Sequence, residues 1–446
     1  MNSKLSVLFV TAEATPFSKV GGLADFAGSL PRALRELGVD ARLMLPRHRN
    51  LSGESRKASV SFPVPLGRRE EQTRLIESEA DGVPVYMLHN DRYFGNRDRV
   101  YGFNDDPQRF VFFSRAVISA MSHMTWRPDV IHANDWHTAP VSTWVDLHGR
   151  DQEPFDRIAT VFTIHSMAYQ GLCGRLILNF GRMEDVPHLD LEPPGKVNWL
   201  AQGIYHSDII STGSPTYARE VMTPEVGGEL SEILRMREDR LFGVLSGIDP
   251  RIWDPSTDPA LPQTFDVDAL RMREVNKTAL QRELRLPADL NVPLLSIVTR
   301  LDPIKGLDLI APALETVMEE QDVQFVLLGT GDESCAQTFR DLQAKYPRHV
   351  RAIIRFDERL ARQIYGGADL FLMPSRSEAG STGVMIAMRY GAVPVVRSTG
   401  GLADTVVDVD RQPERGTGFS FQAYTSDALV RTLRRAVRYL ESSRWS

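Results

Sequence analysis

The sequence predicts an α/β protein made of two doubly wound domains that face a central cleft. In both halves of the 446 residues, short apolar runs alternate with longer amphipathic segments, as in parallel sheets covered by helices. Hydrophobic residues make up 42% of the chain and charged residues 25%, which is enough for a large core. A proline-rich segment separates the two sets of runs, so we expect two domains rather than one.

The expected strands follow one another along the chain. In the first half they are 7–10, 41–45, 85–88, 130–132, 159–164 and 209–212. In the second half they are 294–299, 324–328, 350–354, 370–373 and 394–396. Between them, segment 249–265 contains four prolines, which stop helices and strands, so we place the hinge there. We expect an N-terminal domain over 1–255 and a C-terminal domain over 256–446, with ligands at the carboxyl ends of the strands.

Composition and charge exclude several classes of protein. The net charge of -6 and the pI near 6.0 give no basic surface, so we expect no nucleic-acid partner. Cys173 and Cys335 are the two cysteines and lie far apart, which excludes a disulfide framework and favours a reducing compartment. No apolar run is long enough to span a membrane, and the first is too short for a signal peptide. We therefore expect a soluble, cytoplasmic protein without a membrane partner, and the oligomeric state stays open.

Two predicted strand-to-helix loops carry candidate ligand-binding residues. In the first, Lys19, Gly21 and Gly22 precede a helix, where glycine lets backbone N–H groups approach a ligand oxygen and lysine adds charge. In the second, Arg300 and Lys305 combine a planar guanidinium with a mobile ammonium, which suits a diphosphate. The alternatives are an ordinary tight turn for the first loop and solvated cations for the second.

Further candidates follow other predicted strands. In loop 374–383, small residues surround Glu378, which could accept hydrogen bonds from sugar hydroxyls or merely favour the dipole of the next helix. His165 and the run Asp135, Trp136 and His137 also follow strands. The indole of Trp136 would suit a sugar ring, whereas a histidine at a strand end is more often structural.

Two D-x-D strings, at 266–268 and 408–410, could suggest a metal site. No histidine, glutamate or further aspartate accompanies them at strand ends, so we interpret both as solvated loops and expect no metal.

Longer motifs join these candidates in one order along the chain. They are K-V-G-G-L-A-D at 19–25, D-V-I-H-A-N-D-W-H at 129–137, T-I-H at 163–165, A-Y-Q-G at 168–171, S-P-T-Y-A-R-E at 214–220, R-L-D-P-I-K-G-L-D at 300–308, G-T-G-D at 329–332 and R-Y-G-A-V-P-V-V-R-S-T-G-G-L-A-D-T-V at 389–406. In this order the chain resembles the bacterial glycogen synthases and plant starch synthases, which are retaining glucosyltransferases of the GT-B fold that use ADP-glucose.

This resemblance implies roles for single residues and two Rossmann-like domains, the first of the starch synthase catalytic type and the second of the group 1 glycosyltransferase type. The nucleotide sugar would contact Lys19, Gly21, Gly22, Thr399 and Gly400, and its phosphates Arg300 and Lys305. The transferred glucose would contact His165 and Glu378. The acceptor or glucose subsite would include Asp25, Tyr101, Asp135, Trp136 and His137. No metal cofactor is implied.

The chain also departs from the family pattern on the sugar side of the expected cleft. The departures are Ser377, the loop Ala379–Val384 in place of P-C-G-L, Ser166, Ala201 and Ser246. The sequence also stops at Ser446, before the final S-W helix that the resemblance implies.

We predict a glycogen or starch synthase that transfers glucose from ADP-glucose to the non-reducing end of an α-1,4-glucan with retention. The cytoplasm is the expected location, or a plastid stroma if a transit peptide has been removed. The alternatives are a catalytically weak or silent glucan-binding paralogue that acts as scaffold or primer, and a GT-B transferase for another nucleotide sugar.

Overall fold

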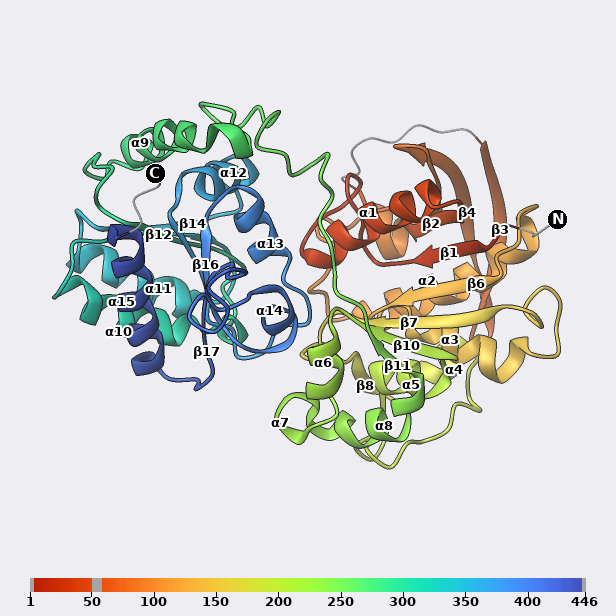
Figure 1. Cartoon of the computed structure of the whole chain (residues 1–446). Coiled ribbons are helices and arrows are strands. Elements are labelled where there is room, and N and C mark those ends of the chain that lie inside the picture. Colours follow the sequence, from red (N-terminus) through yellow and green to blue (C-terminus); the bar gives the residue numbers. More distant parts are fainter. Residues whose placement is uncertain (1–3, 50–57, 443–446) are drawn as a thin grey trace. The chain divides into compact units, whose positions relative to one another are not determined.

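The computed structural model describes residues 4–49 and 58–442, in two compact units, Met1–Val244 and Leu245–Ser446 (Figure 1). The proline-rich segment 249–265 belongs to the second unit, where Trp253, Leu261 and Phe265 are buried in a hydrophobic cluster. The division between the units therefore precedes the segment in which the sequence places the hinge. The reason is that the apolar side chains between the prolines are buried in the second unit's core rather than left in a solvated linker.

The first unit is built on a sheet that comprises, within the described ranges, nine strands in the order β11-β10-β7-β6-β1-β2-β5-β4-β3. Neighbours from β11 to β5 pair in parallel, whereas β4 and β3 pair antiparallel. The strands, with the separate pair β8 and β9, are β1 (Ser6–Val10), β2 (Asp40–Pro46), β3 (Ala58–Leu66), β4 (Arg69–Ala80), β5 (Val83–His89), β6 (Val130–Asn134), β7 (Ala159–Ile164), β8 (Leu172–Gly174), β9 (Lys196–Asn198), β10 (Ile209–Thr212) and β11 (Leu241–Gly243). The helices are α1 (Gly22–Glu36), α2 (Asp106–Ala120), α3 (Ala139–Trp144), α4 (Ile177–Gly181), α5 (Trp199–His206), α6 (Pro215–Glu220), α7 (Pro224–Gly227) and α8 (Ser231–Met236).

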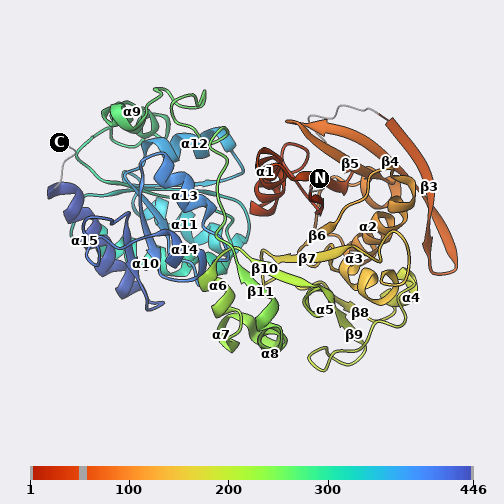
Figure 2. The same ribbon diagram turned by 45° about the vertical axis from the view of Figure 1, so that its right-hand side comes forward.

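The hairpin of β3 and β4, at one edge of this sheet, is absent from the sequence expectations (Figure 2). Pro63 and Pro65 lie inside β3 and argue against a strand there, because proline cannot donate to a ladder. At an edge, however, a strand needs only one bonded side. Phe62 and Val64 are buried while Pro63 is exposed, so β3 alternates as a half-buried strand does.

The second unit contains a parallel sheet that, over the residues described, has six strands in the order β14-β13-β12-β15-β16-β17. They are β12 (Leu294–Val298), β13 (Gln324–Gly329), β14 (Val350–Ile354), β15 (Leu370–Met373), β16 (Val393–Arg397) and β17 (Phe419–Phe421). The helices are α9 (Arg273–Glu283), α10 (Leu307–Met318), α11 (Glu333–Lys345), α12 (Glu358–Gly367), α13 (Thr382–Arg389), α14 (Gly400–Thr405) and α15 (Ser426–Ser442). The strand order reverses between β12 and β15, and in such sheets ligands bind where the loops of these two strands diverge.

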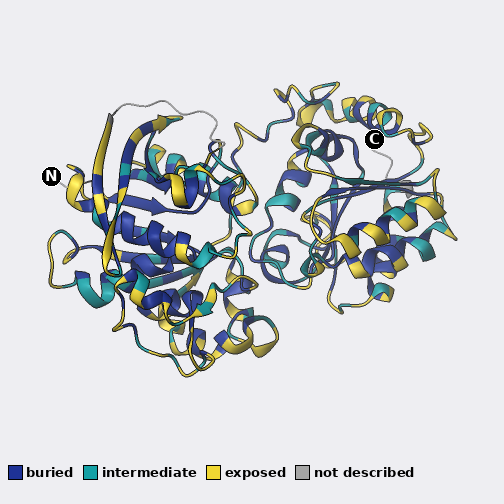
Figure 3. Cartoon of the chain, turned by 180° about the vertical axis from the view of Figure 1, so that it is seen from behind, coloured by how far each residue is buried: buried dark blue, intermediate teal, exposed yellow. Residues whose placement is uncertain are grey.

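Helices cover both faces of the second sheet (Figure 1). Helices α10, α11 and α15 share one hydrophobic cluster with the strands, and α9 and α12 share another. Figure 3 shows the strands buried and the outer sides of the helices exposed, as expected for a parallel sheet. The predicted α/β class and the predicted strands are confirmed.

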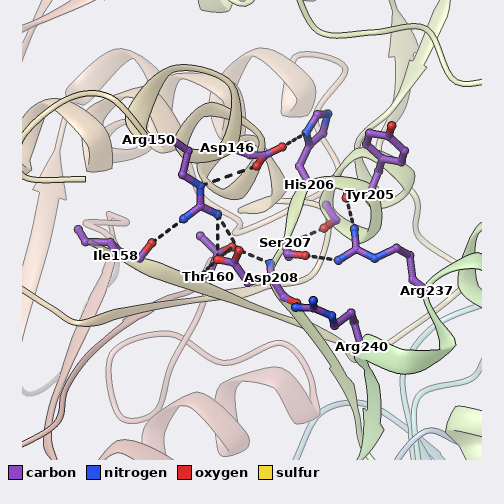
Figure 4. A network of polar contacts seen from close by, with 11 residues as sticks. Asp146, Arg150, Ile158, Thr160, Tyr205, His206, Ser207, Asp208, Arg237 and Arg240 are labelled. Carbon is purple, nitrogen blue, oxygen red and sulfur yellow. Dashed lines mark hydrogen bonds and ion pairs between the residues drawn. The ribbon is translucent and has the colours of Figure 1, made fainter. Parts of the chain in front are cut away.

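A polar network fastens strands β7 and β10 of the first unit to each other (Figure 4). The Nη2 atom of Arg150 lies 2.8 and 2.9 Å from the two carboxylate oxygens of Asp208, which also accepts the N–H of Thr160 at 2.7 Å. Burial opposes ionisation of Asp208, but these hydrogen bonds outweigh it, and the pKa of this carboxyl falls below its ordinary value. Nearby, Arg237 donates to the carbonyl oxygens of Tyr205 and Ser207 and so caps the end of α5.

Candidate functional site

In the second unit, the loops after β12, β13 and β15 touch one another through glycines. Gly306 has a φ of +72°, and a Cβ there would lie 2.1 Å from the carbonyl oxygen of Pro374. Likewise, a Cβ on Gly331 would lie 2.2 Å from the carbonyl oxygen of Leu301. Glycine is required at both positions. The three loops are thereby gathered at the edge of the sheet formed by the carboxyl ends of the strands.

Lys305 and Glu378 form an ion pair at this edge. The Nζ atom of Lys305 lies 2.7 Å from Oε2 of Glu378, and both side chains are largely buried. The hydroxyl of Ser375 donates to the same carboxylate oxygen at 3.1 Å. From the sequence we expect the lysine to contact a phosphate and the glutamate to contact a sugar. The ion pair shows that these two side chains lie next to each other. A single ligand with both groups could reach them together.

Arg300 is a partly exposed cation in the loop after β12. Its side chain is 44% exposed and lies 3.4 Å from the carboxylate of Asp302, a long contact for an ion pair. Asp302 also accepts the N–H of Ile304 at 3.1 Å, which shapes the turn between Arg300 and Lys305. The guanidinium is thus partly accessible to a ligand in solution.

The loop that carries Glu378 is fixed by backbone contacts. The carbonyl oxygen of Glu378 accepts the N–H of Gly401 at 2.9 Å, next to Thr399 and Gly400 at the start of α14. Arg397 donates to the carbonyl oxygen of Arg376 at 2.8 Å. Thr399 and Gly400 thus lie beside the Glu378 loop, and their contact with the nucleotide sugar stays a prediction.

Three of the family departures lie in contacts within this unit. The hydroxyl of Ser381 is buried and lies 2.5 Å from that of Thr405 in α14. A Cβ on Gly380 would lie 3.2 Å from the Oγ atom of Ser246, so two departing positions face each other with small residues. These residues pack the altered loop rather than leaving it a flexible connection.

In the first unit, the loop before α1 is held by Glu13, a residue outside the sequence motifs. Lys19 pairs with Asp25 at 2.8 Å, Gly21 is the residue before α1, and Gly22 begins the helix. The N–H of Val20 donates to the carboxylate of Glu13 at 2.5 Å. This N–H is therefore bonded to a buried side chain, and the expected approach of Gly21 and Gly22 to a ligand stays a prediction.

Glu13 is a buried carboxyl group, 3% exposed, just beyond the carboxyl end of β1. Burial raises its pKa to about 7, although the N–H groups of Val20 and Gly21 and the hydroxyl of Tyr101 favour the ionised form. No motif identifies this residue. Its place directly after a buried strand is the signal that could have found it.

Asp135 and His165 lie together at the ends of β6 and β7. Asp135 has a φ of +57° and accepts the N–H of His165 at 2.8 Å, and burial raises the pKa of its carboxyl to about 7. The Nε2 atom of His165 lies 2.9 Å from the amide oxygen of Asn134, and burial, with His132 nearby, lowers the pKa of His165 to about 3. The imidazole of His165 is therefore neutral at physiological pH and serves as a hydrogen-bonding group.

Tyr101, Trp136 and His137 form an aromatic cluster. The ring of His137 lies 4.2 Å from that of Trp136 and 4.8 Å from that of Tyr101, and burial lowers the pKa of His137 to about 3. Trp136 is only 9% exposed, and a Cβ on Gly171 would lie 2.3 Å from its indole. The open indole face expected for a sugar is covered from the Gly171 side. A direct role for Trp136 in the subsite stays a prediction.

The D-x-D strings have structural partners. Asp408 is buried and, like the exposed Asp410, pairs with Arg435 at 2.7 Å, so the interpretation of 408–410 as a solvated loop is wrong for Asp408. Asp266 accepts the N–H of Asp268 in a local turn. Over residues 4–49 and 58–442, no three acidic, histidine or cysteine side chains gather as a metal site. Within the same ranges, no helix combines the length and the apolar character needed to cross a membrane.

Two family models match the chain. The starch synthase catalytic domain matches residues 6–236, and the group 1 glycosyl transferases match residues 282–443. The glycogen synthase of Thermotoga maritima is 41% identical over 454 residues, covering 99% of this chain and 93% of the relative. That of Geobacillus stearothermophilus is 42% identical over 450 residues, covering 99% and 92%.

Solved structures give the same result. The catalytic domain of starch synthase IV from Arabidopsis thaliana, bound to ADP and acarbose, has a TM-score of 0.91 and 33% identity, with 98% of this chain and 92% of that chain covered. Sucrose-phosphate synthase from Thermosynechococcus elongatus, at 17% identity and a TM-score of 0.59, shares the fold alone. The predicted GT-B class is confirmed, and the chain belongs to the family of glycogen and starch synthases.

Proposed function

We propose that this protein transfers glucose from ADP-glucose to the non-reducing end of an α-1,4-glucan, with retention of configuration. The observation that carries the proposal is the Lys305–Glu378 pair beside the exposed Arg300, at the switch point of the second sheet. The similarity to glycogen synthases over 99% of the chain supports the same reaction. The starch synthase structure that contains ADP and acarbose supports the choice of nucleotide and of a glucan as acceptor.

In this reaction the second unit would stabilise the departing ADP. As the bond to glucose breaks, negative charge grows on the diphosphate, and Arg300 and Lys305 supply fixed positive charge to it. When Lys305 turns to a phosphate, the Glu378 carboxylate is released to accept a hydrogen bond from a glucose hydroxyl. Front-side attack, in which the leaving phosphate helps to remove the acceptor's proton, is what membership of the family implies.

The first unit would contribute groups that hold sugars rather than charge. His165 is a neutral imidazole, and Asp135 is a buried carboxyl fixed by a backbone N–H. Together with Asp25, Tyr101 and His137 they are the proposed glucose and acceptor contacts. Uncharged hydroxyls need oriented donors and acceptors, and these side chains are oriented by their neighbours.

We propose further that the reaction needs no metal, because two cations already lie beside the proposed phosphate site. A cytoplasmic location and the absence of nucleic-acid and membrane partners stay predictions.

A weak or silent glucan-binding paralogue is the second candidate. It is favoured by the small residues Ser246 and Gly380, which face each other where the family pattern has asparagine and cysteine. Retention of Arg300 and Lys305 argues against silence, because a scaffold needs no grip on a diphosphate.

The test is incorporation of radiolabelled glucose from ADP-glucose into glycogen, with UDP-glucose and GDP-glucose as competing donors. We expect label in the polymer, and we expect unlabelled ADP-glucose to reduce the incorporation much more than unlabelled UDP-glucose or GDP-glucose does. An enzyme specific for α-1,4 linkages should release the label. No incorporation would favour the silent paralogue, and preference for another donor would favour the transferase of different specificity.

A further inference from the structure

The carboxylate of Glu13 lies beneath the loop that opens α1. It accepts the N–H of Val20 at 2.5 Å and that of Gly21, the two residues between Lys19 and Gly22. Gly21 is the residue before α1, in an extended conformation and with no side chain that could cap the helix. Two hydrogen bonds to one buried side chain therefore hold the backbone of this loop, in addition to the Lys19–Asp25 pair.

We propose that Glu13 is a positioning residue whose ionised carboxylate holds the loop 19–22, and with it Lys19, in the conformation that receives the donor. The part of this inference that concerns the donor rests on the function proposed above. Glu13 itself need not touch the substrate. The inference about the loop alone depends only on the contacts described.

Protonation would weaken this arrangement. A carboxylate accepts hydrogen bonds on both oxygens, whereas a carboxylic acid uses one oxygen as a donor and cannot serve two N–H groups equally well. The buried environment raises the pKa of Glu13 to about 7, so the carboxyl changes state near neutral pH. The loop should therefore be held above pH 7 and loosen below it.

The groups that face Glu13 do not replace this titration. Asp25, on α1, pairs with Lys19, and Tyr101 brings a hydroxyl whose pKa burial keeps well above 10, so it stays neutral. On the chain before Glu13, the carbonyl of Ala12 bonds to His48, whose pKa burial lowers to about 4. Only Asp135, whose charge acts on Tyr101, changes state in the same range, with a pKa of about 7. A variant of Glu13 must therefore be compared with the wild type.

The variant is Glu13→Gln, which keeps the size of the side chain but turns an N–H₂ group toward one of the two N–H donors. Glu192→Gln is the matched control. Glu192 is also buried and also accepts two backbone N–H groups, from Leu189 at 3.1 Å and from Asn198 at 2.8 Å, but in another loop of the same unit.

The first measurement is hydrogen exchange at Val20 and Gly21, corrected for intrinsic rates. In Glu13→Gln we expect these amides to exchange about tenfold faster at pH 8, as loss of a bond to a charged group implies. In the wild type the same protection should fall between pH 8 and pH 6, and Glu192→Gln should match the wild type. Equal protection in Glu13→Gln and the wild type would overturn the proposal. If the variant does not fold, wild-type protection that stays constant with pH would overturn it equally.

The second measurement is the KM for ADP-glucose from pH 6 to pH 8. Both phosphates of this donor are substituted on two oxygens and keep only a strongly acidic group, so the substrate does not titrate in this range. For one group with a pKa near 7, the wild-type KM should rise about tenfold from pH 8 to pH 6. The KM of Glu13→Gln should be high at both ends of the range and should change less between pH 8 and pH 6 than the wild-type KM, because only Asp135 still titrates; the change in kcat should be smaller. If the KM of Glu13→Gln changed with pH in parallel with the wild-type KM, the proposal that Glu13 positions the loop for the donor would be overturned. If the wild type transfers no glucose, the proposed function fails, while hydrogen exchange still decides whether Glu13 holds the loop.

Discussion

The loop before α1 in the first unit and the loop before α10 in the second both join a parallel strand to a helix, and both carry a lysine. In the first, Lys19 pairs with Asp25, while the buried Glu13 binds the loop's backbone. In the second, Lys305 pairs with Glu378, and Arg300 stays half-exposed. The first loop is thus held by a buried acid, whereas the second carries one cation paired with a glutamate and one that is partly exposed.

This difference extends to the surrounding side chains. In the first unit, burial moves the pKa of Glu13 and Asp135 up to about 7 and that of His165 down to about 3, which in each case disfavours charge. The same strand–loop–helix plan can therefore serve two tasks. In our proposal, the first unit orients uncharged groups and the second supplies charge for a diphosphate.

The largest effect should follow loss of the cation at position 305. Lys305→Ala should lower the rate of transfer about 100- to 1000-fold, because a fixed charge at a developing negative charge is lost. Initial rates with ADP-glucose and glycogen measure this. Lys345→Ala, which breaks an exposed pair with Glu315 in the same unit, is the control and should leave the rate unchanged. Equal rates in Lys305→Ala and the wild type would refute the charged role of the second loop.

A second effect should appear in the pH dependence of stability. Because the pKa of folded Asp135 is about 7, above its unfolded value near 4, the folded state binds more protons in between and loses stability as pH rises. Asp135→Asn has no carboxyl to titrate at this position. As the pH rises from 5 to 8, its free energy of unfolding should therefore increase by up to a few kcal/mol relative to that of the wild type. Urea unfolding at both pH values measures the gain. A constant difference between the two proteins would contradict the buried-acid description of the first unit.

A smaller and opposite pH effect is expected at Asp208, away from the site. Its folded pKa is lowered, so its contribution is present above pH 4 and lost as pH falls through the folded pKa. Asp208→Asn should lower the free energy of unfolding by about 1–2 kcal/mol at pH 7 and by less near pH 3. The effect is modest because the pair with Arg150 is partly exposed. The exposed Asp239→Asn serves as control in the same urea experiment, with a change below about 0.5 kcal/mol. A cost for Asp208→Asn that stays constant down to pH 3 would exclude this assignment.

The smallest expected effect is that of metal removal, which should be none. If Arg300 and Lys305 neutralise the leaving group, transfer should proceed at the same rate in EDTA as in magnesium. A rate that EDTA abolishes and a divalent cation restores would mean that the second unit's cations are insufficient.

The sequence predicts most of the parallel strands, although not β11 or β17, and the loops that carry the candidate residues, because apolar runs and loop residues are local signals. It misses the β3–β4 hairpin, since Pro63 and Pro65 are acceptable only at a sheet edge that tertiary structure creates. The Lys305–Glu378 contact joins residues 73 apart and depends on glycines that let the loops touch. Such contacts are not visible in a linear pattern.

Burial is the other property that local patterns do not give. Trp136 is a good candidate for sugar stacking by residue type, but Gly171 covers part of its indole. Glu13 is the opposite case. A lone glutamate after a strand belongs to no motif, yet burial raises the pKa of its carboxyl to about 7.

The most direct test of the division of labour is the affinity for ADP alone, measured by titration calorimetry in Lys305→Ala and Asp135→Asn. Loss of one charge-assisted contact is worth about 1.5–3 kcal/mol, so Lys305→Ala should bind ADP about 10- to 100-fold more weakly. Asp135→Asn should bind ADP as the wild type does. Wild-type affinity in Lys305→Ala, or a comparable loss in Asp135→Asn, would contradict the assignment of the diphosphate to the second unit.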